Sequence, residues 1–200
     1  MIAILDYGVG NLRSISKALE FVGAKIKITK DYEDIEKSDA IVLPGVGAFT
    51  NAMNELKPLV KVIKSYTRPI LGICLGMQLF FTKSEEGGIS EGLNLIEGRV
   101  VKFPSSVKIP HMGWNSIRII SNKSKLLNGI KSGEYFYFVH SYYCIPKEED
   151  VKIATTLYGV EFSSVIEKEN IFATQFHPEK SGEAGLKIIR NFVNIVDTWR

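Results

Sequence analysis

A short segment around Cys74 constrains the fold more than any other part of the sequence. Residues 72–76 read Gly-Ile-Cys-Leu-Gly, between an apolar run at 69–71 and a helix-like run at 77–81. In a G-x-nucleophile-x-G pattern, a strand turns sharply into a helix and carries a reactive side chain at the turn. The glycines let strand and helix nearly touch, and the helix N-terminus favours a thiolate. The segment predicts such an elbow; the alternative is a core cysteine beside a glycine-rich turn.

Strand and helix patterns alternate through the first third of the chain. Apolar strand-like runs are predicted at 2–6, 25–29, 40–43 and 69–74. Amphipathic helices are predicted at 11–22, 31–38 and 48–66, the last interrupted near Pro58. Strands that alternate with helices imply a parallel sheet covered by helices on both faces.

The second half of the chain is richer in strands. We expect them at 99–103, 115–120, 135–140, 152–157, 163–167 and 171–176, with hairpins among them, and a closing amphipathic helix at 185–199. The whole chain therefore predicts an α/β fold with a mixed sheet that is parallel at its centre. Its 200 residues show no linker, repeat or low-complexity tract, so we expect one domain over 1–200.

Composition and charge narrow the function classes. The net charge is +3, and no cluster of Lys and Arg with interleaved aromatic residues predicts a nucleic-acid groove. No apolar run reaches the roughly 18 residues that a membrane span needs. The two cysteines, Cys74 and Cys144, form no disulfide framework, and no basic leader precedes the first strand, so we expect a cytoplasmic protein. Histidine and cysteine spacings predict no metal site.

A thiol nucleophile needs a base, and the base needs an orienting group. His177 follows an apolar strand in Gln-Phe-His-Pro-Glu, and period-two alternation would place Glu179 on the same side if the strand continued. Because sites in open α/β sheets gather at the carboxyl ends of strands, His177 and Cys74 can meet there. His140 also ends a predicted strand and is the rival base, although no acid follows it closely.

Acyl chemistry also needs an oxyanion hole. The segment 44–47, Pro-Gly-Val-Gly, follows a buried strand, and we expect the backbone N–H groups of Val46, Gly47 and Leu75 to face a tetrahedral oxyanion. One such donor is typically worth about 3–4 kcal/mol. A plain turn between strand and helix is the alternative. The segment 8–11, Gly-Val-Gly-Asn, is only a weak dinucleotide-loop pattern, because Arg13 replaces the third glycine.

The Cys74 segment and His177-Pro-Glu179 closely resemble the class I (triad) glutamine amidotransferases. Nearly the whole chain resembles the branch of that family formed by the glutaminase subunits of imidazole glycerol phosphate synthase, in histidine biosynthesis. The segments that carry this likeness are 6–11, 44–49, 110–115, 137–142 and 175–182. The resemblance implies a flavodoxin-like three-layer sandwich with the mixed sheet as its middle layer.

The resemblance also implies a reaction. Cys74 would attack the side-chain amide of glutamine to give a thioester and ammonia, with His177 as acid and base and Glu179 as its orienter. Gln78 and Glu86 would hold the amino-acid head of glutamine, and Ser141 and Tyr142 would add contacts. The Val46 peptide is expected to reorient to complete the oxyanion hole, and no cofactor is expected.

A partner is implied as well. In the family it is a (β/α)8-barrel cyclase that uses the ammonia to make imidazole glycerol phosphate and AICAR, and the glutaminase is weak until the cyclase binds its ligand. The residues in matching interface motifs are Asn11, Arg13, Trp114, Tyr137 and Lys180. Three alternatives stay open: a related protein that feeds ammonia to another synthase, for example for sugar amination; a stand-alone γ-glutamyl cysteine hydrolase; and a non-catalytic interaction module.

Overall fold

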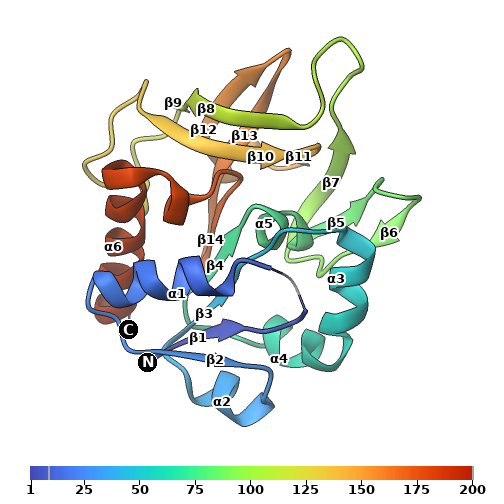
Figure 1. Cartoon of the computed structure of the whole chain (residues 1–200). Coiled ribbons are helices and arrows are strands. Elements are labelled where there is room, and N and C mark those ends of the chain that lie inside the picture. Colours follow the sequence, from blue (N-terminus) through green and yellow to red (C-terminus); the bar gives the residue numbers. More distant parts are fainter. Residues whose placement is uncertain (9, 200) are drawn as a thin grey trace.

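An eight-stranded mixed sheet forms the centre of the protein (Figure 1). The structure is a computed structural model that describes residues 1–8 and 10–199. Five parallel strands come first across the sheet, in the order β2 (Ile26–Thr29), β1 (Ile2–Leu5), β3 (Ala40–Leu43), β4 (Ile70–Ile73) and β14 (Ile171–Thr174). Three antiparallel strands complete it, β13 (Val160–Lys168), β12 (Lys152–Tyr158) and β9 (Arg118–Ile119). The predicted mixed sheet with a parallel centre is confirmed.

Helices cover both faces of this sheet. On one face lie α1 (Leu12–Phe21) and α6 (Gly182–Thr198), and on the other lie α2 (Tyr32–Lys37), α3 (Phe49–Leu56) and α4 (Val60–Lys64). Successive strand residues point to opposite faces, so Ile4 packs in the core under α1 and α6 while Leu5 packs in the core under α3 and α4. The three-layer sandwich is therefore confirmed.

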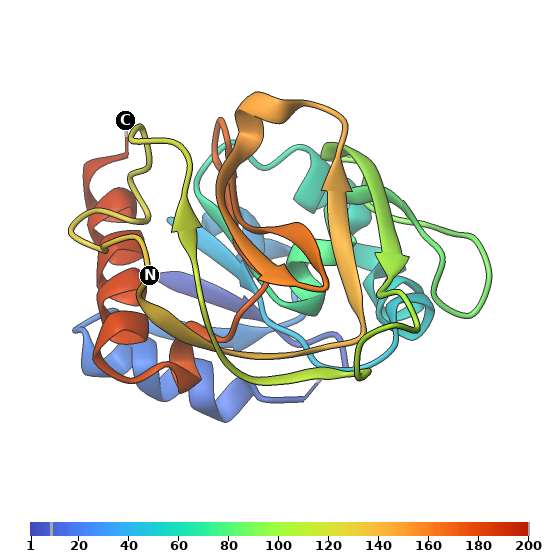
Figure 2. The ribbon, with the colours of Figure 1, turned by 90° about the horizontal axis from the view of Figure 1, so that it is seen from above.

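Two smaller sheets lie above the carboxyl ends of the parallel strands. One contains β11 (Tyr142–Pro146), β7 (Ile96–Lys102), β5 (Phe81–Ser84) and β6 (Ser90–Glu91). The other is a ribbon of β8 (His111–Ser116) and β10 (Tyr135–His140), which runs along one edge of the molecule seen from above (Figure 2). Across the described residues no helix is both long enough and apolar enough to span a membrane.

Some element boundaries differ from the predictions. The helix interrupted near Pro58 is confirmed, because a 3-10 turn, η1 (Lys57–Leu59), separates α3 from α4. The strand predicted at 115–120 is wrong: β8 ends at Ser116, and β9 is a separate short strand. Strand β14 ends at Thr174 rather than 176, α6 begins three residues earlier than predicted, and β5, β6 and β11 were not predicted.

Candidate active site

Cys74 lies at a strained turn between β4 and the short helix α5 (Leu75–Leu79), with φ 53° and ψ −104°. Both flanking glycines are required by close packing. A Cβ at Gly76 would lie 1.8 Å from the carbonyl oxygen of Leu43, and one at Gly72 would lie 2.4 Å from the Phe80 ring. A non-glycine residue adopts positive φ only where its surroundings enforce it, so the geometry confirms the predicted elbow.

His177 and Glu179 form a buried pair. His177 Nδ1 and Glu179 Oε1 are 2.8 Å apart, and each side chain is 1% exposed. The strand continuation that predicted this pairing is wrong: after β14 ends, the 3-10 turn η3 (Pro178–Lys180) folds the carboxylate back onto the ring. Asn11, which precedes α1, also donates its side-chain N–H to Glu179 Oε1.

The thiol and the imidazole are close but are not hydrogen-bonded in this structure. Cys74 Sγ donates to the Val139 carbonyl at 3.7 Å, while His177 Nε2 is buried and has no partner among the described residues. Burial alone would lower the pKa of His177, but the negative charges of Cys74 and Glu179 outweigh it and raise that pKa to about 10. A protonated His177 beside a thiolate is the arrangement that a cysteine nucleophile needs.

His140, the rival base, is excluded by its hydrogen bonds. Its Nδ1 lies 2.8 Å from the Tyr142 carbonyl, and its Nε2 lies 3.0 Å from His111 Nδ1. Burial lowers the pKa of His140 to about 3 and that of His111 to about 4. Both rings are therefore neutral at pH 7, and both nitrogens of His140 are already engaged.

A cavity of about 290 Å³ opens beside Cys74. It lies near the lower end of the range for small-molecule sites. All predicted oxyanion and substrate residues line it: Val46, Gly47, Leu75, Gln78, Glu86, Ser141 and Tyr142. The carboxylate of Glu86 accepts the backbone N–H of Phe49 at 2.9 Å, which fixes it at the N-terminus of α3.

The predicted oxyanion loop is anchored at its base. Gly45 packs so closely on Leu75 that a Cβ there would lie 2.9 Å from the Leu75 Cβ. The Tyr7 hydroxyl donates to the Pro44 carbonyl, and burial raises the pKa of Tyr7, which keeps this donor protonated. Gly47 has φ +132°, a conformation open to glycine. The sequence-based site did not assign Tyr7 a role.

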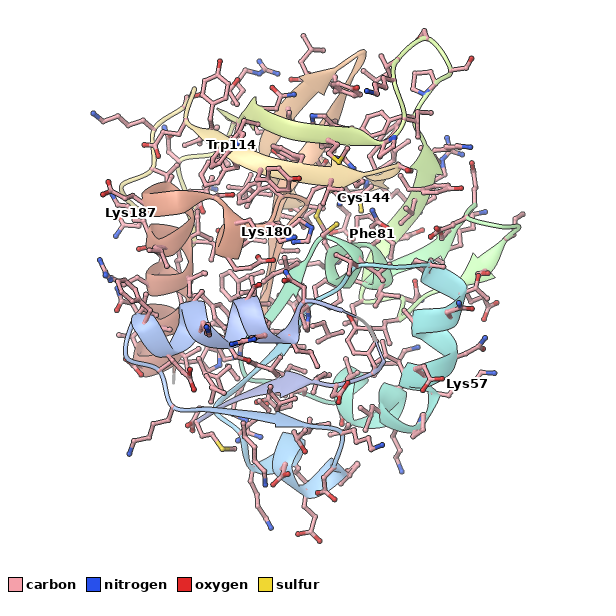
Figure 3. The ribbon with its side chains drawn as sticks, viewed as in Figure 1. Lys57, Phe81, Trp114, Cys144, Lys180 and Lys187 are labelled. Atoms are coloured by element: carbon pink, nitrogen blue, oxygen red, sulfur yellow. The ribbon has the colours of Figure 1, made fainter. Side chains whose placement is uncertain are left out.

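Three of the predicted interface residues lie together on one side of the molecule. The rings of Trp114 and Tyr137 meet edge to face at 6.2 Å, and Lys180 Nζ lies 5.9 Å from the Tyr137 ring centre. Trp114 and Lys180 are labelled in Figure 3. Arg13 is exposed on α1, whereas Asn11 is half-buried against Glu179.

Two other sequence expectations concern bound groups. Among the described residues, no three His, Cys, Asp or Glu side chains are grouped to hold a metal ion. The weak dinucleotide-loop pattern at 8–11 includes Val9, which lies outside the described residues. Its last member, Asn11, has φ 76° and serves the His177–Glu179 pair.

Two groups that contact the thiol were missed. The Val139 carbonyl accepts from Cys74 Sγ, and the side-chain Nε2 of Gln175 lies 3.6 Å from the same sulfur. Gln175 is 0% exposed. A polar residue so close to His177 in the sequence was the only available signal, because its partners are distant along the chain.

Comparison with known proteins gives consistent results. The family model "Glutamine amidotransferase class-I" matches residues 3–196. "Imidazole glycerol phosphate synthase subunit HisH" of Archaeoglobus fulgidus is 57% identical over 98% of this chain and 99% of that protein. The protein of the same name in Methanocaldococcus jannaschii is 53% identical over 98% of this chain and 100% of that one. A putative GMP synthase protein from Thermoplasma acidophilum, with a TM-score of 0.76 and 24% identity over 100% of this chain and 94% of that one, shares the fold.

Proposed function

Because the chain belongs to the class I glutamine amidotransferases, in the branch of the imidazole glycerol phosphate synthase subunits, we propose that it is the glutaminase subunit of that enzyme. It hydrolyses L-glutamine to glutamate and ammonia and delivers the ammonia to a synthase partner. The observation that carries the proposal is the Cys74 elbow beside a buried His177–Glu179 pair, at the edge of a cavity of amino-acid size. The chain acts as one domain over 1–200 and needs no cofactor.

Each step of the proposed reaction uses a group already described. The Cys74 thiolate attacks the γ-carboxamide carbon of glutamine, and the negative charge moves to the amide oxygen, which faces the N–H groups of Val46, Gly47 and Leu75. The Val46 peptide reorients to complete this oxyanion hole. The C–N bond then breaks, the nitrogen takes a proton from His177 and leaves as ammonia, and a thioester on Cys74 remains.

Hydrolysis of the thioester restores the enzyme. Neutral His177 takes a proton from water, the hydroxide adds to the thioester carbon, and the C–S bond breaks to release glutamate and the Cys74 thiolate. Glu179 holds His177 Nδ1 throughout, so that Nε2 faces the sulfur. Gln78 and Glu86 bind the amino-acid head of glutamine, while Ser141 and Tyr142 add contacts from the opposite wall of the cavity.

The proposed partner is a (β/α)8 barrel, the cyclase of the same synthase, which forms a heterodimer with this chain in the cytoplasm and makes imidazole glycerol phosphate and AICAR. Asn11, Arg13, Trp114, Tyr137 and Lys180 form the docking face. An aromatic cluster rimmed by charge is typical of protein interfaces. The names of the relatives favour this partner over a synthase for sugar amination, and they also favour it over a stand-alone hydrolase.

The test uses the co-purified complex with the cyclase. Cys74→Ala is expected to abolish synthesis from glutamine and to leave synthesis from added ammonium salt unchanged, because only the ammonia supply is lost. Loss of both activities would show that Cys74 is structural and contradict the assignment. The wild-type chain without cyclase should hydrolyse glutamine slowly, and fast turnover by the isolated chain would instead support a stand-alone hydrolase.

A further inference from the structure

Gln175 lies beside the sulfur of Cys74 and has no part in the reaction described so far. It follows β14, its side chain is fully buried, and its Nε2 is 3.6 Å from Cys74 Sγ. A second buried amide, Gln78, lies behind it: Gln78 Nε2 is 3.3 Å from Gln175 Oε1 and 2.9 Å from the Tyr142 carbonyl. The Tyr142 carbonyl, Gln78, Gln175 and Cys74 therefore form one line of hydrogen bonds.

The Tyr142 carbonyl determines the direction of this line. A backbone carbonyl only accepts hydrogen bonds, so Gln78 must turn its NH2 group toward it. That NH2 group only donates, so Gln175 must turn its oxygen toward Gln78 and its own NH2 group toward Cys74. A flipped Gln175 would oppose two NH2 groups. The group that faces the sulfur is therefore a donor.

The same carbonyl is held from its other side. His140 Nδ1 lies 2.8 Å from the Tyr142 oxygen and must donate to it, so His140 Nε2 accepts from His111 Nδ1 at 3.0 Å. Asn115 Nδ2 completes this side at 3.3 Å from His111 Nε2. Since every direction follows from one acceptor, the line that aims Gln175 has a single consistent arrangement.

A fixed donor beside the sulfur favours the thiolate over the thiol. In the thiol form, Cys74 donates its proton to the Val139 carbonyl at 3.7 Å. When the proton leaves, that contact is lost, but the contact with Gln175 becomes a hydrogen bond to a charged acceptor, which is roughly twice as strong as a neutral one. Cys74 is 5% exposed, so water gives its sulfur little solvation.

We propose that Gln175 is a catalytic residue that donates a hydrogen bond to the Cys74 sulfur and holds the thiolate for attack, with Gln78 as the positioning residue that aims it. This inference rests on the proposed function, in which Cys74 is the nucleophile. Gln175 forms and breaks no covalent bond. It keeps its protons while the sulfur–carbon bond forms and the carbon–nitrogen bond breaks, and it meets the thiolate again when water cleaves the thioester.

Two substitutions at Gln175 test the proposal in the complex with the cyclase. Gln175→Glu keeps the shape but replaces the donor with an oxygen, and Gln175→Leu removes the polar group. We measure the rate of Cys74 alkylation by iodoacetamide against pH, read at the peptide level, together with kcat and KM for glutamine. Cys144 is 1% exposed and burial raises its pKa, so it stays unmodified. Both variants should move the alkylation midpoint up by about one pH unit and lower kcat about tenfold, with KM within about twofold.

Asn191→Asp is the matched control. Asn191 is a buried amide on α6 whose Nδ2 donates to the Leu126 carbonyl at 2.8 Å, far along the chain from the sulfur. It should lower the melting temperature, as a buried acid does, and leave the alkylation midpoint unchanged. If neither Gln175 variant folds, Gln78→Leu replaces them: it frees Gln175 to rotate and should move the midpoint in the same direction.

The outcomes separate this inference from the proposed function. Wild-type complex that is not labelled at Cys74 by 6-diazo-5-oxo-L-norleucine would overturn the proposed function itself. Labelled, active wild type with unchanged midpoint and kcat in the variants would overturn only the role of Gln175. A change in melting temperature or KM alone would also overturn it, because that is what a purely structural amide gives.

Discussion

Replacement of Gly76 by alanine tests the packing that creates the elbow. A Cβ at this position would lie 1.8 Å from the carbonyl oxygen of Leu43 and 2.8 Å from its carbonyl carbon. Carbon–oxygen contacts rarely fall below about 3.3 Å, so α5 and β3 would have to separate by about 1.5 Å. Both are backbone atoms of a buried strand, and no side-chain rotation relieves the clash.

The expected loss of stability follows from this distance. Overpacking of a core typically destabilises by about 1–3 kcal/mol, and a clash with buried backbone belongs at the upper end. For a chain of this size, about 3 kcal/mol corresponds to a melting temperature lower by about 6–12 °C. Helix propensity predicts the opposite sign, because alanine is favoured over glycine in a helix by about 0.5–1 kcal/mol. The sign of the change therefore separates the two effects.

Gly23→Ala is the control for this experiment. Gly23 has φ +93° and nothing within 4 Å of an added Cβ, so it carries only the left-handed penalty of about 1–2 kcal/mol. Thermal unfolding of both variants, followed by circular dichroism, gives the comparison. Glutaminase kcat in the complex should also fall for Gly76→Ala, because Leu75 and Cys74 move with α5. A Gly76→Ala variant that melts no lower than Gly23→Ala would refute the reasoning.

Two further predictions concern hydrogen bonds and protonation. Asn11→Ala removes a donor to the Glu179 carboxylate and should lower kcat about tenfold or more, whereas Arg13→Ala, on the exposed side of α1, should change cyclase affinity alone; steady-state kinetics and titration with the cyclase decide. Burial lowers the pKa of His111 to about 4 and that of His140 to about 3, so the unfolded chain takes up protons near pH 6.5 that the folded chain refuses. Stability should fall by up to about 1.4 kcal/mol per pH unit for each histidine below that pH, and equal urea midpoints at pH 6.5 and 5.5 would contradict it.

The parallel half of the fold could be predicted because its strands are continuously buried. The strand at 40–43 is 0% exposed throughout, and an apolar run between turn residues is a direct signal of this burial. The β8–β10 ribbon gives a weaker signal. His111 and Asn115 in β8 are linked through buried hydrogen bonds rather than apolar packing, so β8 lacks the alternation that marks a strand, and its boundaries were wrong.

The site shows the same division. Cys74, His177 and Glu179 were predicted because local patterns mark them. Gln175 and Tyr7 were not assigned, because their roles depend on partners 101 and 37 positions away. The pairing of His177 with Glu179 was predicted for the wrong reason, since Pro178 starts a turn and ends any strand. Long-range polar contacts of this kind leave no periodic trace in a sequence.

Strand β10 explains how docking of the proposed partner could control the chemistry. The Tyr137 carbonyl accepts the backbone N–H of His177 at 2.9 Å, and two residues on, the Val139 carbonyl accepts the Cys74 thiol at 3.7 Å. The Tyr137 side chain faces outward beside Trp114. A thiol contact at 3.7 Å is weak, so a small shift of β10 can release the sulfur toward the unpartnered His177 Nε2. Coupling between sites is typically about 1–3 kcal/mol, which is enough to favour this change, so slow turnover without the partner follows from the resting geometry.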